Sequence, residues 1–225
     1  MNLNLLDNPV WHALNSYHRH LAIRGEIAAR YQPDIFIVSA MPENSRSGFD
    51  DLRNLVEVDE LTAGIGKFPK DLAGWEVRDH FSLSQMICGN LKTAHQVDAI
   101  RLTIDDVPDM LDLIAIAQPG PFLSRTIELG EYLGLFQNGQ LVAMAGERMH
   151  FPGFCEVSAV CTHPDFRGRG YGRALTAIVA ENIVLRGEVP FLHVALTNEI
   201  AKNLYQKLGF RLRAELQLAI LRRIA

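Results

Sequence analysis

The chain has 225 residues, of which 48% are hydrophobic and 21% are charged. This is the composition of an ordinary globular protein, long enough for one large domain or two small ones. The formal net charge is -4, so the overall charge gives no reason to expect nucleic acid or a membrane as a partner. An anionic ligand would need a local cluster of basic side chains and backbone amides.

The three cysteines, Cys88, Cys155 and Cys161, are too few for a disulfide framework. They lack the spacing of metal ligands, so we expect buried core residues, no metal site and a cytoplasmic location. The first residues lack a basic start followed by an apolar run, and no apolar run approaches the ~20 residues that span a bilayer. We therefore expect neither a signal peptide nor a membrane helix.

Residues 1–95 show an irregular pattern of elements. Apolar residues at helical spacing predict a helix over 11–30, which Asn8-Pro9 would begin. The other expected elements are a strand over 35–38, a helix over 49–55 and one long strand over 75–88. This part forms an N-terminal α/β block in our interpretation, either a separate domain or a lid.

Residues 96–225 follow a more regular alternation. The dipeptide Asn138-Gly139 is a strong hairpin signal, so the strands beside it should pair antiparallel. The expected strands are 99–103, 131–136, 141–149, 154–162 and 191–196, with two short ones within 210–221. The expected helices are 105–117, 122–129, 170–186 and 198–208. This order predicts an α/β protein with a mixed sheet and helices on both faces.

A glycine-rich turn connects the strand over 154–162 to the next helix. Its sequence is Arg167-Gly168-Arg169-Gly170-Tyr171-Gly172. Glycines let backbone amides approach a ligand, and the free N–H groups of the first helical turn attract an anion together with the helix dipole. Arg167, Arg169 and Arg173 add positive charge, so the expected ligand is a diphosphate group. The alternative is a tight connection with solvated arginines.

Two other kinds of phosphate loop fit this turn poorly. The Walker loop needs a Gly-Lys-Ser/Thr run, which the turn lacks. The dinucleotide fingerprint has a different glycine spacing and opens a parallel βαβ unit, whereas antiparallel strands are expected here. The glycines alone therefore do not identify which phosphate-bearing ligand the turn binds.

Two segments together resemble the GNAT acyltransferases. The first, Arg167-x-x-Gly170-x-Gly172, matches the (Gln/Arg)-x-x-Gly-x-(Gly/Ala) loop that grips the pyrophosphate of acyl-CoA in that family. The second is similar to another family signature and reads Asn198-x-x-Ala201-x-x-x-Tyr205-x-x-x-Gly209-Phe210. The resemblance covers about residues 96–225 and is strongest to the FR47-like branch. It implies a GNAT fold there and a degenerate GNAT-like half or a substrate-side lid over 1–95.

The resemblance also implies acetyl-CoA or another acyl-CoA as co-substrate, without a metal. The residues that it assigns to coenzyme A are Val160, Cys161, Thr162, Arg167, Gly168, Arg169, Gly170, Tyr171, Gly172, Arg173, Asn198, Ala201 and Asn203. Asn198 is alternatively a helix cap.

Two residues are expected to carry the proton transfers. The resemblance puts the Tyr205 hydroxyl near the thioester sulfur, where a phenol with a pKa of about 10 can protonate the departing thiolate. Glu156 is the expected base, directly or through a water. Strand alternation would put it on one face with Ser158, Val160 and Thr162. A core tyrosine and a solvated glutamate are the alternatives, and the rival bases are His150, His163 and His193.

The expected activity is an acyl-CoA-dependent N-acyltransferase, most simply an N-acetyltransferase, which acts on the amine of a small molecule or amino acid. The expected assembly is a monomer or homodimer. One alternative is a non-catalytic coenzyme-A-binding sensor of the same fold. Another is a nucleotide-binding protein of a different fold, against which the missing Walker lysine argues.

Overall fold

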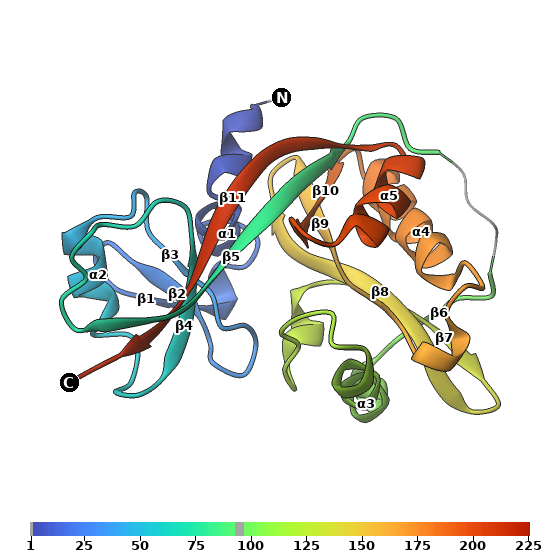
Figure 1. Ribbon diagram of the computed structural model, residues 1–225, viewed down its shortest axis with the longest axis horizontal. Helices are drawn as coiled ribbons and strands as arrows, with labels where there is room; N and C mark the ends of the chain where they lie inside the picture. The colour runs from blue at the N-terminus through green and yellow to red at the C-terminus, as the bar shows by residue number, and fades with distance from the viewer. Residues whose placement is uncertain (1, 93–96) are drawn as a thin grey trace.

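The computed structural model describes residues 2–92 and 97–225, and its largest element is a mixed sheet of eight strands in the order β4-β11-β5-β10-β9-β8-β7-β6. These strands are β4 (Leu61–Ile65), β5 (Trp75–Cys88), β6 (Ile100–Arg101), β7 (Tyr132–Gln137), β8 (Gln140–Phe151), β9 (Phe154–Thr162), β10 (Val189–Ala195) and β11 (Phe210–Arg223). A three-stranded sheet consists of β1 (Ala22–Arg24), β2 (Ala29–Tyr31) and β3 (Ser39–Ala40). Figure 1 shows two lobes, which the long ribbon of β5 and β11 connects.

Helices cover both faces of the main sheet. The α-helices are α1 (Pro9–Leu14), α2 (Arg46–Leu52), α3 (Val107–Ala117), α4 (Tyr171–Leu185) and α5 (Glu199–Lys207). The 3-10 helices are η1 (Leu3–Asp7), η2 (Arg19–Leu21), η3 (Ile104–Asp106), η4 (Thr126–Leu129) and η5 (Pro164–Phe166). One apolar cluster joins α4 and α5 to the sheet, and separate clusters join α1 and α3 to the other face. The predicted α/β class with a mixed sheet is confirmed.

Local signals were read correctly in the second half of the chain. The strand expected over 154–162 is β9, and the helices expected over 170–186 and 198–208 are α4 and α5. At the predicted hairpin, Asn138 and Gly139 have φ angles of 53° and 81°, as the two central residues of a type I′ turn require. The three cysteines are free and buried, as expected.

The helix expected over 11–30 is wrong beyond its first turns. Asn8 does begin α1, because its side chain accepts a hydrogen bond from the Trp11 N–H, but α1 ends at Leu14. The chain then enters η2 and the β1–β2 hairpin, which turns at Gly25. Asp51 fixes this turn by accepting the N–H groups of residues 27 and 28, a long-range contact that helical periodicity does not reveal.

Three strand predictions need correction. Residues 35–38 contribute only a bridge between Val38 and Ala63, and β3 follows them. Strand β4 was not predicted. Glycine usually weakens a strand, but Gly64 is a buried strand residue whose added Cβ would lie 3.0 Å from the Phe68 ring. The two short strands expected within 210–221 are one strand, β11, which pairs with β5 from Phe210 to Arg223 across two bulges.

The main sheet crosses the boundary predicted at residue 95. Strands β4 and β5 precede this residue, yet β5 lies between β10 and β11 and pairs with both. The division into two domains at residue 95 stays a prediction, but residues before it complete the sheet of residues after it.

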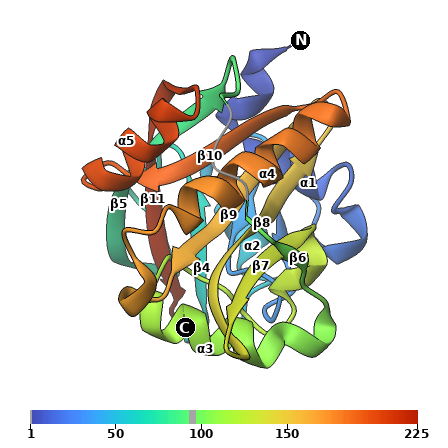
Figure 2. The same cartoon turned by 90° about the vertical axis from the view of Figure 1, so that its right-hand side faces the viewer.

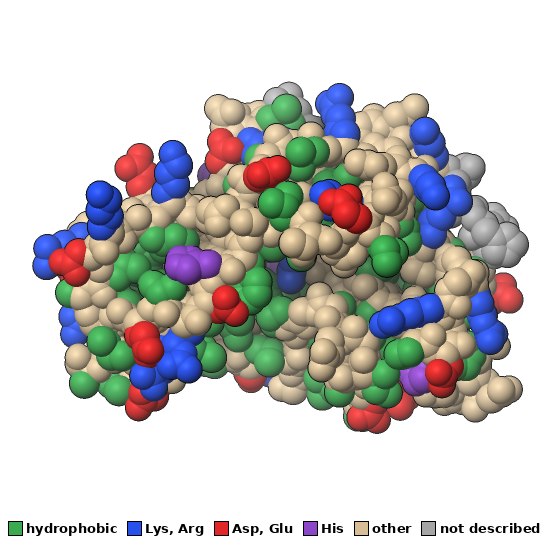
Figure 3. Space-filling view, viewed as in Figure 1, with side chains coloured by type: hydrophobic (Ala, Val, Ile, Leu, Met, Phe, Trp, Pro, Cys, Tyr) green, Lys and Arg blue, Asp and Glu red, His purple; other side chains and the backbone are tan. Residues whose placement is uncertain are grey.

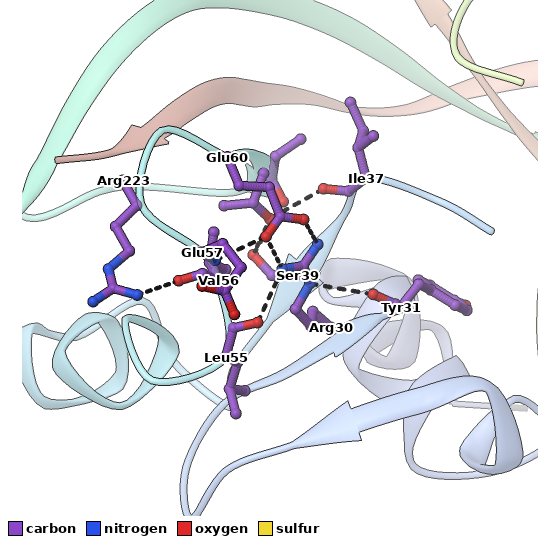
Figure 4. Close-up of polar contacts among 11 residues, drawn as sticks. Arg30, Tyr31, Ile37, Ser39, Leu55, Val56, Glu57, Glu60 and Arg223 are labelled. Atoms are coloured by element: carbon purple, nitrogen blue, oxygen red, sulfur yellow. Dashed lines mark hydrogen bonds and ion pairs between the residues drawn. The ribbon is translucent and has the colours of Figure 1, made fainter. Parts of the chain in front are cut away.

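A buried arginine connects several segments of the N-terminal lobe. Arg30 on β2 forms an ion pair with Glu60 and donates hydrogen bonds to the carbonyls of Leu55 at 2.9 Å and Tyr31 at 3.2 Å (Figure 4). Only 2% of Arg30 is exposed, so the loss of any of these partners would leave a buried donor unsatisfied. This cluster fixes β2 against the segment that leads into β4.

Within the described residues, no helix combines the length and apolar character that crossing a membrane requires.

Candidate active site

Two central strands separate part of the way along the sheet. The parallel strands β9 and β10 pair only from Phe154↔Val189 to Glu156↔Phe191. Residues 157–162 of β9 have no ladder partner on this side among the described residues, and Figure 2 shows the two strands diverging there. Their backbone N–H and C=O groups can therefore pair with an extended ligand that runs between the strands.

A β-bulge in β9 lies at the same place. Between the pairs Met144↔Cys161 and Gly146↔Ser158, β9 has one more residue than β8, and Ala159 adopts a positive φ of 51°. The extra residue shifts the alternation of side chains between the two faces of the sheet.

The bulge overturns the predicted arrangement of side chains along β9. Glu156 and Ser158 face the side of the sheet that α1 and α3 cover. Val160 and Thr162 face α4 instead, since a Cβ added at Gly172 would lie 3.7 Å and 3.6 Å from their side chains. The prediction that Glu156, Ser158, Val160 and Thr162 share one face is therefore wrong, and the bulge puts the first pair on the opposite side from the second.

The glycine-rich turn follows β9 and leads into α4. Gly168 and Gly170 both have a φ of 80°, and a Cβ at either position would meet open space. Glycine is thus required there by backbone conformation rather than by lack of room. The turn is exposed from Arg167 to Gly170, and no side chain caps the α4 N-terminus.

The basic side chains of this turn are available to a ligand. No ion pair to a described residue engages Arg167, Arg169 or Arg173. The Arg169 guanidinium lies over the Phe166 ring, 4.8 Å from its centroid. Three arginines beside the uncapped N-terminus of a 15-residue helix form a site with the charge and the donors that a diphosphate needs.

Helix α5 begins beside the C-terminal end of β10. Asn198 caps it by accepting the Ala201 N–H at 3.1 Å, which confirms the predicted cap. Ala201 packs against the core cluster that includes Tyr205, and Asn203 is exposed.

Tyr205 lies one turn further along α5 and is 8% exposed. Its ring packs edge-on against Phe210, with centroids 6.1 Å apart. Burial, with a smaller contribution from the Cys161 thiol, raises the pKa of the Tyr205 phenol to about 12. The phenol therefore keeps its proton throughout the neutral range.

The carboxylate of Glu156 is fully buried and surrounded by donors. It accepts hydrogen bonds from Arg148 Nε at 2.7 Å, Arg148 Nη2 at 2.8 Å, His193 Nδ1 at 2.8 Å and the Met149 N–H at 3.4 Å. Burial would raise the pKa of this carboxyl, but the charge and hydrogen bonds of Arg148, together with His193, lower it to about 2. These contacts disfavour the predicted base role, since such a carboxylate holds a proton weakly and is not accessible to an amine.

Hydrogen bonds also indicate which ring nitrogen of His193 donates. Arg213 donates to Gln85 Oε1 at 2.9 Å, which orients the amide. Gln85 Nε2 then donates to the Leu6 carbonyl at 2.8 Å and to His193 Nε2 at 3.0 Å. His193 must therefore carry its proton on Nδ1 and donate it to Glu156, an assignment that follows from the network. Both ring nitrogens have partners, so His193 is a hydrogen-bonded core residue, which disfavours it as a rival base.

The other two candidate histidines also have partners. His150 Nε2 lies 2.7 Å from Glu188 Oε1. His163 Nδ1 accepts the Asp165 N–H at 3.3 Å and thereby caps η5.

A small pocket opens on the face of β9 that carries Ser158. Its volume is about 20 Å³, and it is lined by Ile114, residues 119–121, Phe122, Arg148, Ser158 and Ala159. Figure 3 shows the hollow between the lobes, with a basic side chain recessed in it. A larger groove of about 670 Å³ lies between β5 and residues 66–72 and includes none of the predicted site residues.

Arg148 was missed in the sequence, where a single arginine in a strand has the pattern of a solvated residue. A signal did exist, because Pro152-Gly153 predicts a turn between the strands that carry Arg148 and Glu156. Opposite charges at nearby positions on paired strands favour an ion pair.

Comparisons with known proteins show which family has this fold and sequence. The FR47-like protein family model matches residues 132–218. A GNAT-family protein from Novosphingobium aromaticivorans DSM 12444 is 32% identical, with a TM-score of 0.90, and the match covers 98% of this chain and 99% of that one. No curated protein matches the chain.

Two more distant structures share the fold. A GCN5-related N-acetyltransferase from Kribbella flavida has a TM-score of 0.62 at 14% identity, covering 99% of this chain and 95% of that one. A GCN5-related N-acetyltransferase-like protein from Streptococcus suis 89/1591 has a TM-score of 0.58 at 16% identity, covering 95% and 92%. Identity over nearly the full length of the first relative decides the assignment: the chain belongs to the GNAT family, whose members transfer acyl groups from acyl-CoA.

Proposed function

We propose that this chain is an acyl-CoA-dependent N-acyltransferase, most simply an N-acetyltransferase, which acts on the amine of a small molecule or amino acid. The observation that carries the proposal is a continuous path for the donor. The basic turn and uncapped N-terminus of α4 lie at the end of β9, directly after the stretch of β9 that is unpaired towards β10. A diphosphate at the turn and an extended amide-bearing arm along β9 match the two chemically distinct parts of coenzyme A.

In this proposal, each segment of the site holds one part of the donor. Amides of the turn and the three arginines hold the diphosphate, and the backbone of residues 160–162 pairs with the arm. The amine nitrogen attacks the thioester carbonyl carbon, the C–S bond then breaks, and the thiolate takes a proton from the Tyr205 hydroxyl. The attacking nitrogen loses its own proton to water, and the Tyr205 phenolate regains a proton from solvent. Glu156 acts by holding Arg148 in place.

The N-terminal lobe is proposed to form the acceptor side of the site. The Phe36 ring lies 4.8 Å from the Arg148 guanidinium, and the Leu6 carbonyl accepts a hydrogen bond from Gln85. Residues of the first 95 thus contact the polar network beside the pocket. This supports a role as a substrate-side wall.

Acetyl-CoA is expected to stabilise the protein against thermal unfolding. At 100 times its dissociation constant, a ligand that binds only the folded state adds about 2.7 kcal/mol to the free energy of unfolding. An Arg167→Ala, Arg173→Ala double variant should need a much higher acetyl-CoA concentration for the same shift, because it removes two of the charges at the turn. Arg78→Ala, which changes a half-exposed arginine on β5 outside the proposed site, is the matched control.

The absence of any shift with acetyl-CoA and longer acyl-CoAs would overturn the proposal. Release of free thiol from acyl-CoA across a panel of amines then separates an enzyme from a protein that only binds coenzyme A.

A further inference from the structure

Arg148 lines the small pocket, and one edge of its guanidinium is not used by Glu156. Its Nε and Nη2 atoms donate to Glu156, whereas no hydrogen bond to a described residue engages Nη1. The side chain is 17% exposed and contributes to the pocket wall. A guanidinium has five N–H donors, so this edge retains donors for a ligand.

The guanidinium is held rigidly in this orientation. Glu156 binds it in a two-point geometry, and His193 in turn fixes Glu156. The Phe36 ring stacks against the guanidinium on one face. A donor that is already ordered loses little conformational freedom when it binds a ligand, so a hydrogen bond from Nη1 adds efficiently to affinity.

The pocket is chemically selective. Apart from Arg148, its polar side chain is the hydroxyl of Ser158, and its walls are apolar residues such as Ile114 and Phe122. A volume of about 20 Å³ has room for one water-sized group. A single oxygen atom fits this space and the donors that face it, whereas a second ammonium group would be repelled by the guanidinium.

The pocket also lies beside the reacting centre of the proposed function. Ser158 and Ala159 line it, and Ala159 is the bulge residue at the unpaired stretch of β9. An acceptor with an oxygen at Arg148 would thus lie next to the strand along which the acyl donor runs.

We propose that Arg148 recognises a carbonyl or carboxylate oxygen of the acceptor, so that the substrates are α-amino acids or their carbonyl derivatives rather than plain alkyl amines. This inference rests on the proposed function, because it concerns the acceptor of the same reaction. Arg148 is a binding residue in it, and Glu156 is a positioning residue.

The test compares three sets of acceptors with acetyl-CoA and the full-length protein: common α-amino acids, the corresponding amino-acid amides, and the amines that lack the carbonyl group. Thiol release gives kcat and KM, and the thermal shift of the coenzyme-A-bound protein gives binding independently of turnover. We expect the best carbonyl-bearing acceptor to have kcat/KM about 10- to 100-fold above the matching amine, the range of one charge-assisted hydrogen bond. A higher kcat/KM for the amino acid than for its amide indicates that Arg148 binds a carboxylate. Equal values of kcat/KM indicate that it binds a carbonyl oxygen.

Arg148→Lys keeps the charge beside Glu156 but loses the second edge of the guanidinium. It should raise KM for carbonyl-bearing acceptors by about 10- to 100-fold and leave KM for plain amines unchanged. Arg186→Lys is the matched control, since Arg186 pairs with the buried Glu147 at 2.7 Å outside the pocket.

Two results would overturn the inference while the proposed function stands. One is a kcat/KM for plain amines equal to that for amino acids, and the other is an Arg148→Lys variant whose KM rises equally for all three sets of acceptors. Carbonyl-dependent binding without thiol release would reject the proposed reaction and with it the acceptor role, and would leave Arg148 only as a binding site for a carbonyl or carboxylate oxygen. Because the wild-type comparison needs no variant, poor folding of Arg148→Lys does not remove the test. If none of the three sets binds to the coenzyme-A complex, the inference is also wrong.

Discussion

Glu156→Gln is expected to lower the free energy of unfolding by roughly 3 kcal/mol at neutral pH. The substitution removes the carboxylate that neutralises Arg148, so a largely buried guanidinium loses its charged partner. Folding lowers the pKa of the Glu156 carboxyl from 4.5 to about 2. This difference corresponds to a contribution of roughly 3 kcal/mol to the free energy of unfolding, which agrees with the expected loss. Urea unfolding of both proteins at pH 7 measures the effect.

The pH dependence of the unfolding free energy tests the same ion pair independently, because its direction is predicted. Since the pKa of Glu156 is depressed in the folded state, its contribution is complete above the unfolded value of 4.5 and is lost as the pH falls towards about 2. Wild-type protein should therefore lose stability over this window, and Glu156→Gln should lack that part of the loss. Glu131→Gln, which disrupts the exposed pair with Arg101, should behave as wild type. Equal stability of Glu156→Gln and wild type would contradict the buried ion pair.

The parts of the fold that were predicted correctly depend on local chemistry. Proline and glycine end β9 and shape the turn before α4, and Asn138-Gly139 specifies a hairpin within a few residues. The pairing of Trp75 with Arg223 depends instead on residues far apart in the sequence. No local pattern states which distant strand β5 joins, so neither its central place in the sheet nor the length of β11 was predicted.

The candidate site also consists of a part that is continuous in the sequence and a part that is assembled from distant strands. The turn that we propose to bind the donor is one continuous segment, so its residues could be proposed together from the sequence, and their role stays a prediction. The proposed acceptor side brings together Arg148 from β8, His193 from β10 and Gln85 from β5, and the bulge at Ala159 decides which β9 side chains join them. An extra residue in one strand reverses the faces of all later side chains, so period-two reasoning fails there. The contacts of Glu156 in that network disfavour its predicted role as base and support the positioning role that we propose.

Tyr205→Phe is expected to lower kcat by about 100- to 10,000-fold without weakening acyl-CoA binding, the range found when a general acid is removed. The substitution keeps the ring that packs against Phe210 and removes only the hydroxyl, so the fold should be preserved. Because burial raises the pKa of Tyr205 to about 12, this phenol stays protonated at neutral and mildly alkaline pH. The ratio of wild-type kcat to variant kcat should therefore be the same at every pH between about 6 and 10. A phenol with an unperturbed pKa would begin to lose its proton near the upper end of this range, and the ratio would then fall.

Tyr132→Phe provides the matched control, because Tyr132 is also a buried tyrosine but lies on β7, in the apolar cluster on the opposite face of the sheet. Its hydroxyl is 3.5 Å from the Thr126 carbonyl, so little is lost with it. Thiol release measured for both variants with saturating acyl-CoA, together with the thermal shift by acyl-CoA, distinguishes a catalytic from a packing role. A Tyr205→Phe enzyme with full turnover would show that solvent protonates the thiolate. A variant that loses acyl-CoA binding and turnover together would instead assign Tyr205 to the core beneath the donor site.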